Sequence, residues 1–297
     1  MNRALLLEVL AEALAGTLRD GDPRLAGVEL SLEPVAGRVQ VVRGAGANVG
    51  VLATPQGCLL VDTAFSPIVP RIRAALGALE GGGRVRWVVN THWHADHTHG
   101  NGAVAGEAVL LAHAAARRRL AAWGAGLAGG SAAPALPVVT FEDGLVLDLP
   151  GEEVRVWHPG PGHTDGDAVV YFTRANVLQT GDLYVTYGLP FVDASSGGSV
   201  RGTVRALEGV LRELPADVGV IPGHGPVSSR AEALTFAAVL GECLERVQAA
   251  HRAGWTREEM AAREVLGRHA ALATPFVTAP AFLSLVHAEV AAGEGRA

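Results

Sequence analysis

The sequence predicts an α/β protein in which short apolar strands alternate with helices and a helical segment closes the chain. Three observations support this class. Apolar runs of four to six residues, rich in valine and leucine, are typical of buried strands. Metal-binding side chains follow directly after four of these runs. After residue 229 the chain is predicted to be mostly helical, up to about residue 293.

The composition narrows the possible functions. The chain has 297 residues, enough for one large or two small domains, and 49% of them are hydrophobic, so a sizeable core can form. A net charge of −6 gives no general attraction to nucleic acid phosphate. No apolar run reaches the roughly 18 residues that a membrane helix needs. We therefore expect a small-molecule partner, no nucleic acid and no membrane, and the oligomeric state stays open.

The N-terminal segment, residues 1–25, is predicted to contain a helix packed on the core. Its apolar start resembles a secretion signal, but Glu8 and Glu12 interrupt it, and the leucines follow a helical period. The two cysteines, Cys58 and Cys243, are far apart and give no disulfide framework. A cytoplasmic location is expected, with an atypical signal peptide as the alternative.

The next elements follow in order along the chain. Strands are expected near residues 28–33, 38–43, 48–53 and 57–62. Ser66 and Pro67 should cap a helix that runs to about Glu80. A strand at 84–89, a short helix, a strand at 108–111 and a helix from about Ala114 come next. Residues 124–137 form either a mobile cover over the site or a surface insertion.

The second half is predicted to contain three more strands, at residues 153–157, 176–179 and 217–221. The final helices should break at Gly254 and around Thr274 and Pro275.

The densest group of chemical side chains is the pattern His92-x-His94-x-Asp96-His97, which leaves the strand at 84–89. Side chains two apart point the same way in an extended backbone, so His92 and His94 can share one ion while Trp93 points toward the core. Asp96 and His97 lie after the bend and can face a second ion. Imidazole and carboxylate suit zinc or a similar divalent metal.

Three later strand ends each deliver one more residue of ligand type beside a glycine. These are His163 after 153–157, Asp182 after 176–179 and His224 after 217–221. Glycine permits a tight turn and a close approach of the backbone to a metal.

With these motifs the sequence resembles the metallo-β-lactamase superfamily over about residues 38–228. The resemblance implies that His92, His94 and His163 hold one metal and that Asp182 bridges to a second. Asp96, His97 and His224 would complete the second site. Asp62 would support the ligand loop without touching metal.

The resemblance also implies a four-layered αββα sandwich with the metals at one edge. Residues 26–228 would be the catalytic domain, and residues 229–297 a helical extension of the same domain. The implied cofactors are two zinc ions, with iron or manganese as other options. The best-known antibiotic-degrading members carry cysteine where this chain has Asp182. With an aspartate at position 182, the chain resembles the glyoxalase II, lactonase and nuclease branches of the superfamily.

The expected reaction is metal-assisted hydrolysis of a small acyl substrate: an ester, thioester, lactone or lactam. Two divalent ions lower the pKa of a shared water to near 7, so that hydroxide forms at neutral pH. Asp96 and Asp182 would orient this hydroxide and accept its proton. The alternatives are an antibiotic hydrolase like the β-lactamases and a non-hydrolytic iron enzyme like the persulfide dioxygenases. A nuclease and a scaffold protein with a structural metal are further alternatives.

Several other residues are candidates for the surroundings of the site. His99 is expected beside the ligands or in the pocket wall, and Tyr184 or Tyr187 could donate to an oxyanion. Apolar pocket walls are expected from Phe65, Trp123, Tyr187 and Phe191. All 24 basic residues are arginine, so no lysine can clamp a substrate anion. The remaining histidines, at positions 113, 158, 251, 269 and 287, are interpreted as structural.

Overall fold

The computed structural model describes residues 22–126 and 135–294, together with Leu5, Glu8, Val9, Glu12 and Leu18. The first four of these N-terminal residues are helical, and Val9 is fully buried in the core. At these positions the structure agrees with the predicted N-terminal helix. A short helix, α2 (Pro23–Ala26), then leads into the first sheet.

The first sheet has seven strands in chain order. Its strands are β1 (Ser31–Ala36), β2 (Val39–Arg43), β3 (Val49–Thr54), β4 (Gly57–Val61), β5 (Val85–Asn90), β6 (Val109–His113) and β7 (Val139–Phe141). The strands β1 to β4 are antiparallel, and β4 to β7 are parallel. Parallel strands need crossovers, which here are α3 (Val69–Leu76), α4 (Ala95–Thr98), α5 (Asn101–Val104) and α6 (Ala114–Gly126).

The second sheet has six strands in the order β13-β12-β11-β10-β9-β8. Its strands are β8 (Gly144–Leu149), β9 (Glu152–Trp157), β10 (Val169–Phe172), β11 (Val177–Gln179), β12 (Gly219–Ile221) and β13 (Ser228–Ser229). Only β11 and β12 are parallel, and α7 (Val200–Glu213) lies between them in the chain.

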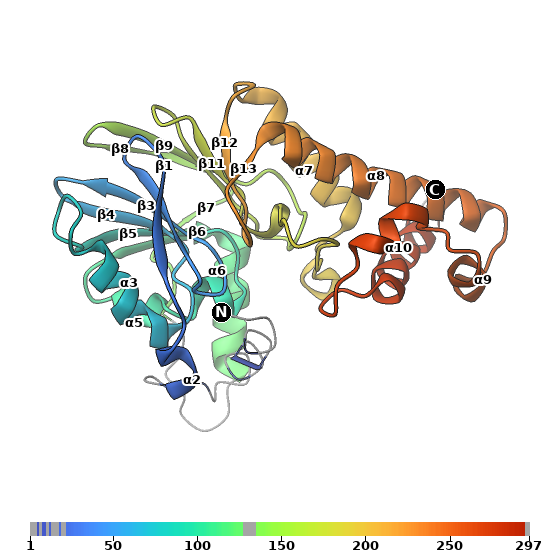
Figure 1. Ribbon diagram of the computed structural model, residues 1–297, viewed down its shortest axis with the longest axis horizontal. Coiled ribbons are helices and arrows are strands. Elements are labelled where there is room, and N and C mark those ends of the chain that lie inside the picture. The colour runs from blue at the N-terminus through green and yellow to red at the C-terminus, as the bar shows by residue number, and fades with distance from the viewer. Residues whose placement is uncertain are drawn as a thin grey trace.

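The two sheets pack face to face with helices on both outer faces, which confirms the predicted αββα sandwich (Figure 1). Side chains such as Val61 and Val89 of the first sheet meet Val156 and Phe172 of the second in a buried cluster. The outer face of the first sheet packs on α3, and that of the second on α7 and the start of α8. Each sheet therefore contributes one apolar face to the centre and one to a helical layer.

A helical extension follows the sandwich and projects from it, to the right in Figure 1. It consists of α8 (Arg230–Arg252), α9 (Arg257–Ala262), the 3₁₀ helix η4 (Gly267–Leu272) and α10 (Ala279–Glu294). The breaks at Gly254 and near Thr274 agree with the prediction. In the described part of the chain, no helix is long and apolar enough to span a membrane.

Some predicted elements differ from the structure. The helix expected from Ser66 to Glu80 is a 3₁₀ turn, η1 (Ser66–Ile68), followed by α3, which ends at Leu76. Phe65, not Ser66, occupies the N-cap position of η1, and it makes no side-chain cap hydrogen bond. Of the segment 124–137, Gly124–Gly126 end α6, and residues 127–134 lie outside the described residues.

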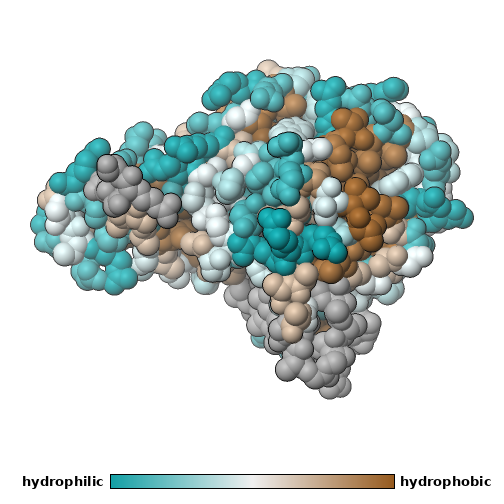
Figure 2. Space-filling model, turned by 180° about the vertical axis from the view of Figure 1, so that it is seen from behind, coloured by the Kyte–Doolittle hydropathy of each residue, from teal (hydrophilic) through white to brown (hydrophobic). Residues whose placement is uncertain are grey.

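On the face of the molecule opposite to that in Figure 1, apolar residues are distributed unevenly. Apolar residues gather mainly on the sandwich half, to the right in Figure 2. The exposed apolar side chains include Val138 beside β7 and Val146 on β8, which are the terminal strands of their sheets.

Candidate metal centre

The histidine-rich loop begins where β5 ends, and a buried asparagine pair fixes its two ends. Asn90 and Asn101 exchange side-chain hydrogen bonds of 3.1 and 2.8 Å, and Thr63 Oγ1 donates to Asn101 Oδ1. Between them the chain turns into α4, whose first turn carries Asp96 and His97. The loop is therefore held at both ends before any ligand side chain is considered.

Asp62, which follows β4 directly, contacts this loop. Its carboxylate accepts hydrogen bonds from the backbone N–H of Thr91 at 2.7 Å and from Thr91 Oγ1 at 2.8 Å. The same carboxylate lies 2.7 Å from His97 Nδ1. This contact leaves His97 Nε2 facing the other candidate ligands.

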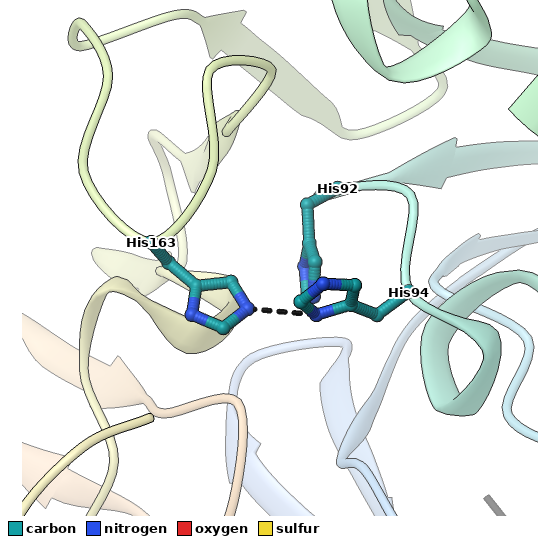
Figure 3. Close-up of side chains that lie close together, drawn as sticks. All are labelled: His92, His94 and His163. Atoms are coloured by element: carbon teal, nitrogen blue, oxygen red, sulfur yellow. Dashed lines mark hydrogen bonds between the residues drawn. The ribbon is translucent and has the colours of Figure 1, made fainter. Parts of the chain in front are cut away.

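Three histidines converge from the two sheets to form a first cluster (Figure 3). His163 Nδ1 donates to the carbonyl of Phe191 at 2.9 Å, so its Nε2 atom turns toward His94 Nδ1, also at 2.9 Å. His92 Nε2 is buried and has no hydrogen-bond partner. The three ring nitrogens lie within 4.8 Å of one another, close enough to share one ion.

A second cluster lies beside the first. Asp96, His97 and His224 again offer ligand atoms within 4.8 Å of one another. Asp182 lies between the clusters: its carboxylate is 3.2 Å from His97 Nε2, 3.4 Å from His224 Nε2 and 3.8 Å from His163 Nε2. The structure thus brings all seven predicted ligands together.

The two clusters differ in their electrostatics. Burial, together with the neighbouring histidines, keeps the pKa of His92 well below its ordinary value and lowers the pKa of His163 to about 4. Burial also acts to lower the pKa of His224, but the carboxylates of Asp182 and Asp96 outweigh it and raise the pKa to about 10. Burial alone would raise the pKa of Asp96, yet His97 and His224 bring it to about 2. His92 and His163 of the first cluster are therefore neutral, whereas the second cluster pairs ionised carboxylates with imidazolium.

The chemistry of these residues fits divalent metal ions. In the described part of the chain, the buried side-chain atoms without a hydrogen-bond partner are His92 Nε2, His97 Nε2, Gln179 Oε1 and Asp182 Oδ1. Three of these atoms belong to His92, His97 and Asp182, whose ligand atoms also lie within 4.8 Å of one another. Buried polar atoms are normally paired, so three unpaired atoms this close together indicate a ligand that binds there.

Two residues that the sequence reasoning missed hold the ligands in place. Asp193 Oδ2 lies 2.9 Å from His94 Nε2 and so turns His94 Nδ1 toward the first cluster. Asn48, at the edge of β3, binds the carbonyls of Pro222 and Gly225 on both sides of His224, at 2.8 Å each. Neither residue has a local sequence signal, because both act across the fold.

Aromatic rings lie beside the two clusters. Phe191 lies with its ring centre 6.0 Å from those of His94 and His163, and Tyr187 lies 5.9 Å from His224. Phe276, from the helical extension, contacts both aromatic rings. The predicted walls Tyr187 and Phe191 therefore border the clusters, and Phe276 is an addition that the sequence did not indicate.

Other predicted surroundings are wrong. Phe65 is fully buried in the core under the first sheet, and Trp123 packs against the same core. Tyr184 is buried, and its hydroxyl lies 2.8 Å from Ser228 Oγ, which rules out the suggested oxyanion contact in this arrangement. Trp93 is half-buried and donates to Ser196 Oγ, so it does not enter the core.

The remaining histidines lie outside the ligand clusters. His99 accepts the backbone N–H of Ser66 at Nδ1 and so ties the ligand loop to η1. His158 Nδ1 lies 2.6 Å from the carbonyl of Asp167, and its ring stacks on that of His113. His269 pairs with Glu242, and His251 contacts His287, all within the extension.

Comparisons with known proteins agree with this geometry. The family model described as the metallo-beta-lactamase superfamily matches residues 42–231. A hydroxyacylglutathione hydrolase from Anaeromyxobacter dehalogenans (strain 2CP-C) is 34% identical over 213 residues, which are 69% of this chain and 72% of that protein. A metallo-beta-lactamase type 2 from Bacillus cereus is 26% identical over 184 residues, 62% of this chain and 69% of that protein.

A solved structure shares the fold. The metallo-beta-lactamase from Pontibacter korlensis superposes with a TM-score of 0.59 at 20% sequence identity. The match covers 72% of this chain and 99% of that one.

Proposed function

The chain belongs to the metallo-β-lactamase superfamily, and we propose that it is a dinuclear zinc hydrolase of a small acyl substrate, an ester, thioester, lactone or lactam. The observation that carries the proposal is the convergence of seven ligand-type side chains, with buried and unpaired donor atoms, at one edge of the sandwich. The hydroxyacylglutathione hydrolase to which the chain is similar favours the acyl class, and a thioester within it.

The proposed division of ligands follows the two clusters. His92, His94 and His163 would hold one ion as neutral imidazoles, and Asp182 would reach both ions from its position between the clusters. The other ion would be held by Asp96, His97 and His224. When bound, divalent ions supply Lewis acidity toward the substrate carbonyl and toward the attacking water.

The chain's own residues would perform the remaining tasks. The carboxylates of Asp96 and Asp182 stay ionised at neutral pH, because the adjacent His97 and His224 outweigh burial and lower both pKa values. Ionised carboxylates accept hydrogen bonds only, so they can orient the protons of a water molecule. Tyr187, Phe191 and Phe276 would hold the apolar part of the substrate and exclude water beside it.

The expected substrate is uncharged or weakly anionic. The chain contains no lysine to clamp an anion, and its net charge of −6 repels polyanions at long range. We also propose that β-lactam turnover is weak, because Asp182 supplies a hard oxygen where a thiolate would be softer. Nucleic acid is not an expected substrate.

A hydrolysis screen of the zinc-loaded protein tests this function. It compares thioesters, lactones, β-lactams and phosphodiesters, with the metal content of each sample measured in parallel. We expect thioester or lactone hydrolysis at about two zinc ions per chain, lost on addition of a chelator. Oxygen uptake by an iron-loaded sample, without hydrolysis by the zinc form, would support an iron enzyme instead. Efficient phosphodiester turnover would overturn the acyl substrate class, and efficient β-lactam turnover would overturn the expectation that β-lactams are poor substrates.

A further inference from the structure

A second pocket, of about 500 Å³, lies between the sandwich and the helical extension. One wall is the segment Tyr184–Leu189, and the others come from the chain around Val227, from α8 and from the end of η4. None of the predicted metal ligands is among the described residues that line it. Its volume falls within the roughly 300–1,000 Å³ that is typical of sites for small molecules.

The lining of this pocket is apolar and lacks positive charge. Val227, Phe236 and Val239 present partly exposed apolar side chains to it, Leu272 is 41% exposed at its edge, and Leu189 and Leu240 are buried in its wall. The one charged side chain among the described lining residues is Glu232. Its carboxylate is already bound by Ser228 and Ser229 as part of the cap of α8. An anionic ligand would therefore meet no counter-charge here, and one carboxylate of its own sign.

The hydroxyl groups of the wall already have partners. Tyr184 bonds to Ser228, Thr235 Oγ1 donates to the carbonyl of Ala231 at 2.9 Å, and Thr186 Oγ1 donates to the carbonyl of His224 at 3.2 Å. A ligand would gain little from hydrogen bonds with these groups. It would gain mainly by covering apolar surface, which favours an uncharged and apolar molecule.

The wall is also tied on both sides, so the pocket is a built feature of the fold. The backbone N–H of Leu189 donates to the carbonyl of Leu272 at 3.0 Å, and Gly188 leaves no room for a side chain, because a Cβ there would lie 2.2 Å from the same oxygen. On the other side, the backbone N–H of Thr186 donates to the carbonyl of His224 at 3.2 Å. A ligand against this wall would touch the segment that holds His224.

We propose that this pocket is a separate binding site for an uncharged, apolar small molecule. The inference does not rest on the proposed hydrolase function, because it uses neither the metal ligands nor the aromatic rings beside them, except Tyr187. The two ideas can therefore fail independently.

A matched pair of fluorescent probes tests the proposal on the full-length, zinc-loaded protein. N-phenyl-1-naphthylamine is uncharged, and 8-anilino-1-naphthalenesulfonate has the same ring system with a sulfonate added. We expect the uncharged probe to bind at least about tenfold more tightly, since the pocket has no cation for the sulfonate. Equal or tighter binding of the sulfonate would overturn the proposal.

Two tryptophan substitutions locate the probe. Val239→Trp fills the pocket, whereas Ala238→Trp places the same side chain one position away on α8, where Ala238 is exposed and does not line the pocket. We expect Val239→Trp to weaken the affinity for the uncharged probe at least about tenfold. Ala238→Trp should change this affinity less than about twofold. Unchanged binding in Val239→Trp would show that the probe binds elsewhere and would refute the site. If Val239→Trp does not fold, Leu272→Glu at the exposed edge is the second variant, with the same expected loss and the same refuting outcome.

Discussion

Asp182 connects the two proposed metal positions, since its carboxylate lies 3.2 to 3.8 Å from histidines of both clusters. Changing Asp182 to Ala should release the second ion, because three neutral imidazoles still suffice for the first. We expect about one zinc ion per chain in place of about two, and hydrolysis reduced at least about a hundredfold. Metal analysis and turnover of the same sample measure this. A variant with full metal content and full turnover would show that Asp182 does not bridge.

Asp193 should act on the first ion through His94. Replacing it by Asn keeps the size of the side chain but weakens the 2.9 Å contact that orients the imidazole. Supporting carboxylates of this kind typically contribute 10- to 100-fold in metal affinity, so a loss of about tenfold or more is expected. Competition with a chelator measures it. The control is Ser195→Ala, which removes one of the hydrogen bonds to Asp193 Oδ1 and keeps the contact between Asp193 Oδ2 and His94. Equal affinities in both variants would contradict this role.

The candidate ligands could be predicted from the sequence because four of them lie within six positions and the others follow strands beside a glycine. Asp193, Asn48 and Phe276 could not be predicted in this way. Each contacts its partner across the fold, and a lone acid, amide or aromatic residue has no local pattern. Phe65, which follows β4, and Trp123, near the end of α6, failed for a related reason: an aromatic residue can face either the pocket or the core, and sequence alone does not distinguish the two.

At the scale of elements, the end of β12 determines how closely His224 approaches the centre. A Cβ atom at Gly223 would lie 1.9 Å from Asp182 Oδ1, whereas a Cβ at Gly219, at the start of the same strand, would meet nothing nearer than 3.9 Å. Gly223→Ala should therefore displace the Asp182 carboxylate and reproduce the Asp182→Ala phenotype. Gly219→Ala should retain metal and activity. Metal content and turnover of the two variants check this, and equal behaviour would show that the turn tolerates a side chain.

Two stacked imidazoles connect the sheets near β6 and β9. His113 ends β6 and His158 follows β9, with ring centres 4.1 Å apart. Burial, followed by the proximity of His158, lowers the pKa of His113. The unfolded chain then binds the proton more readily, so stability is lost as pH falls through the ordinary histidine pKa of about 6.5. His113→Phe should reduce this loss. Urea midpoints of both proteins at about pH 7.5 and about pH 5.5 measure it, and an unchanged difference would contradict it.

The predictability of the elements followed their burial pattern only in part, since β10, a fully buried strand, was not predicted. Strands that are buried on both faces, such as β3 and β4, read as continuous apolar runs and were located within a few residues. The helix after Ser66 was predicted too long. Residues 77–80 continue the mixture of polar and apolar residues seen in α3, but they form turns and not a helix. β8 was not predicted, since its alternating, half-exposed residues give a weaker signal than an apolar run.

At the scale of the whole molecule, the extension and the sandwich share one apolar cluster. Leu189, Val192 and Val200 of the sandwich pack with Phe282 and Val286 of α10. The proposed single domain therefore predicts one cooperative unfolding transition.

The substitution Phe282→Ala tests whether the extension and the sandwich unfold in one transition. The side chain is fully buried, so its truncation should cost about 3–5 kcal/mol of the free energy of unfolding. Because the cluster is shared, the loss should appear equally in far-ultraviolet circular dichroism, which follows the helices, and in tryptophan fluorescence, which mainly follows the sandwich. A transition at lower denaturant concentration in circular dichroism, without one in tryptophan fluorescence, would show that the extension unfolds separately.

The placement of the ligands has a consequence for how the protein matures. His92, His94, Asp96 and His97 follow strands of the first sheet, whereas His163, Asp182 and His224 follow strands of the second. Neither cluster can close from one sheet alone. During synthesis the chain therefore has to emerge past β9 before the first ion can be held, and past β12 before the second ligand set is complete. The two metal ions would then bind late and one after the other, after the two sheets have formed. The free energy of metal binding would add to the free energy with which the sheets dock.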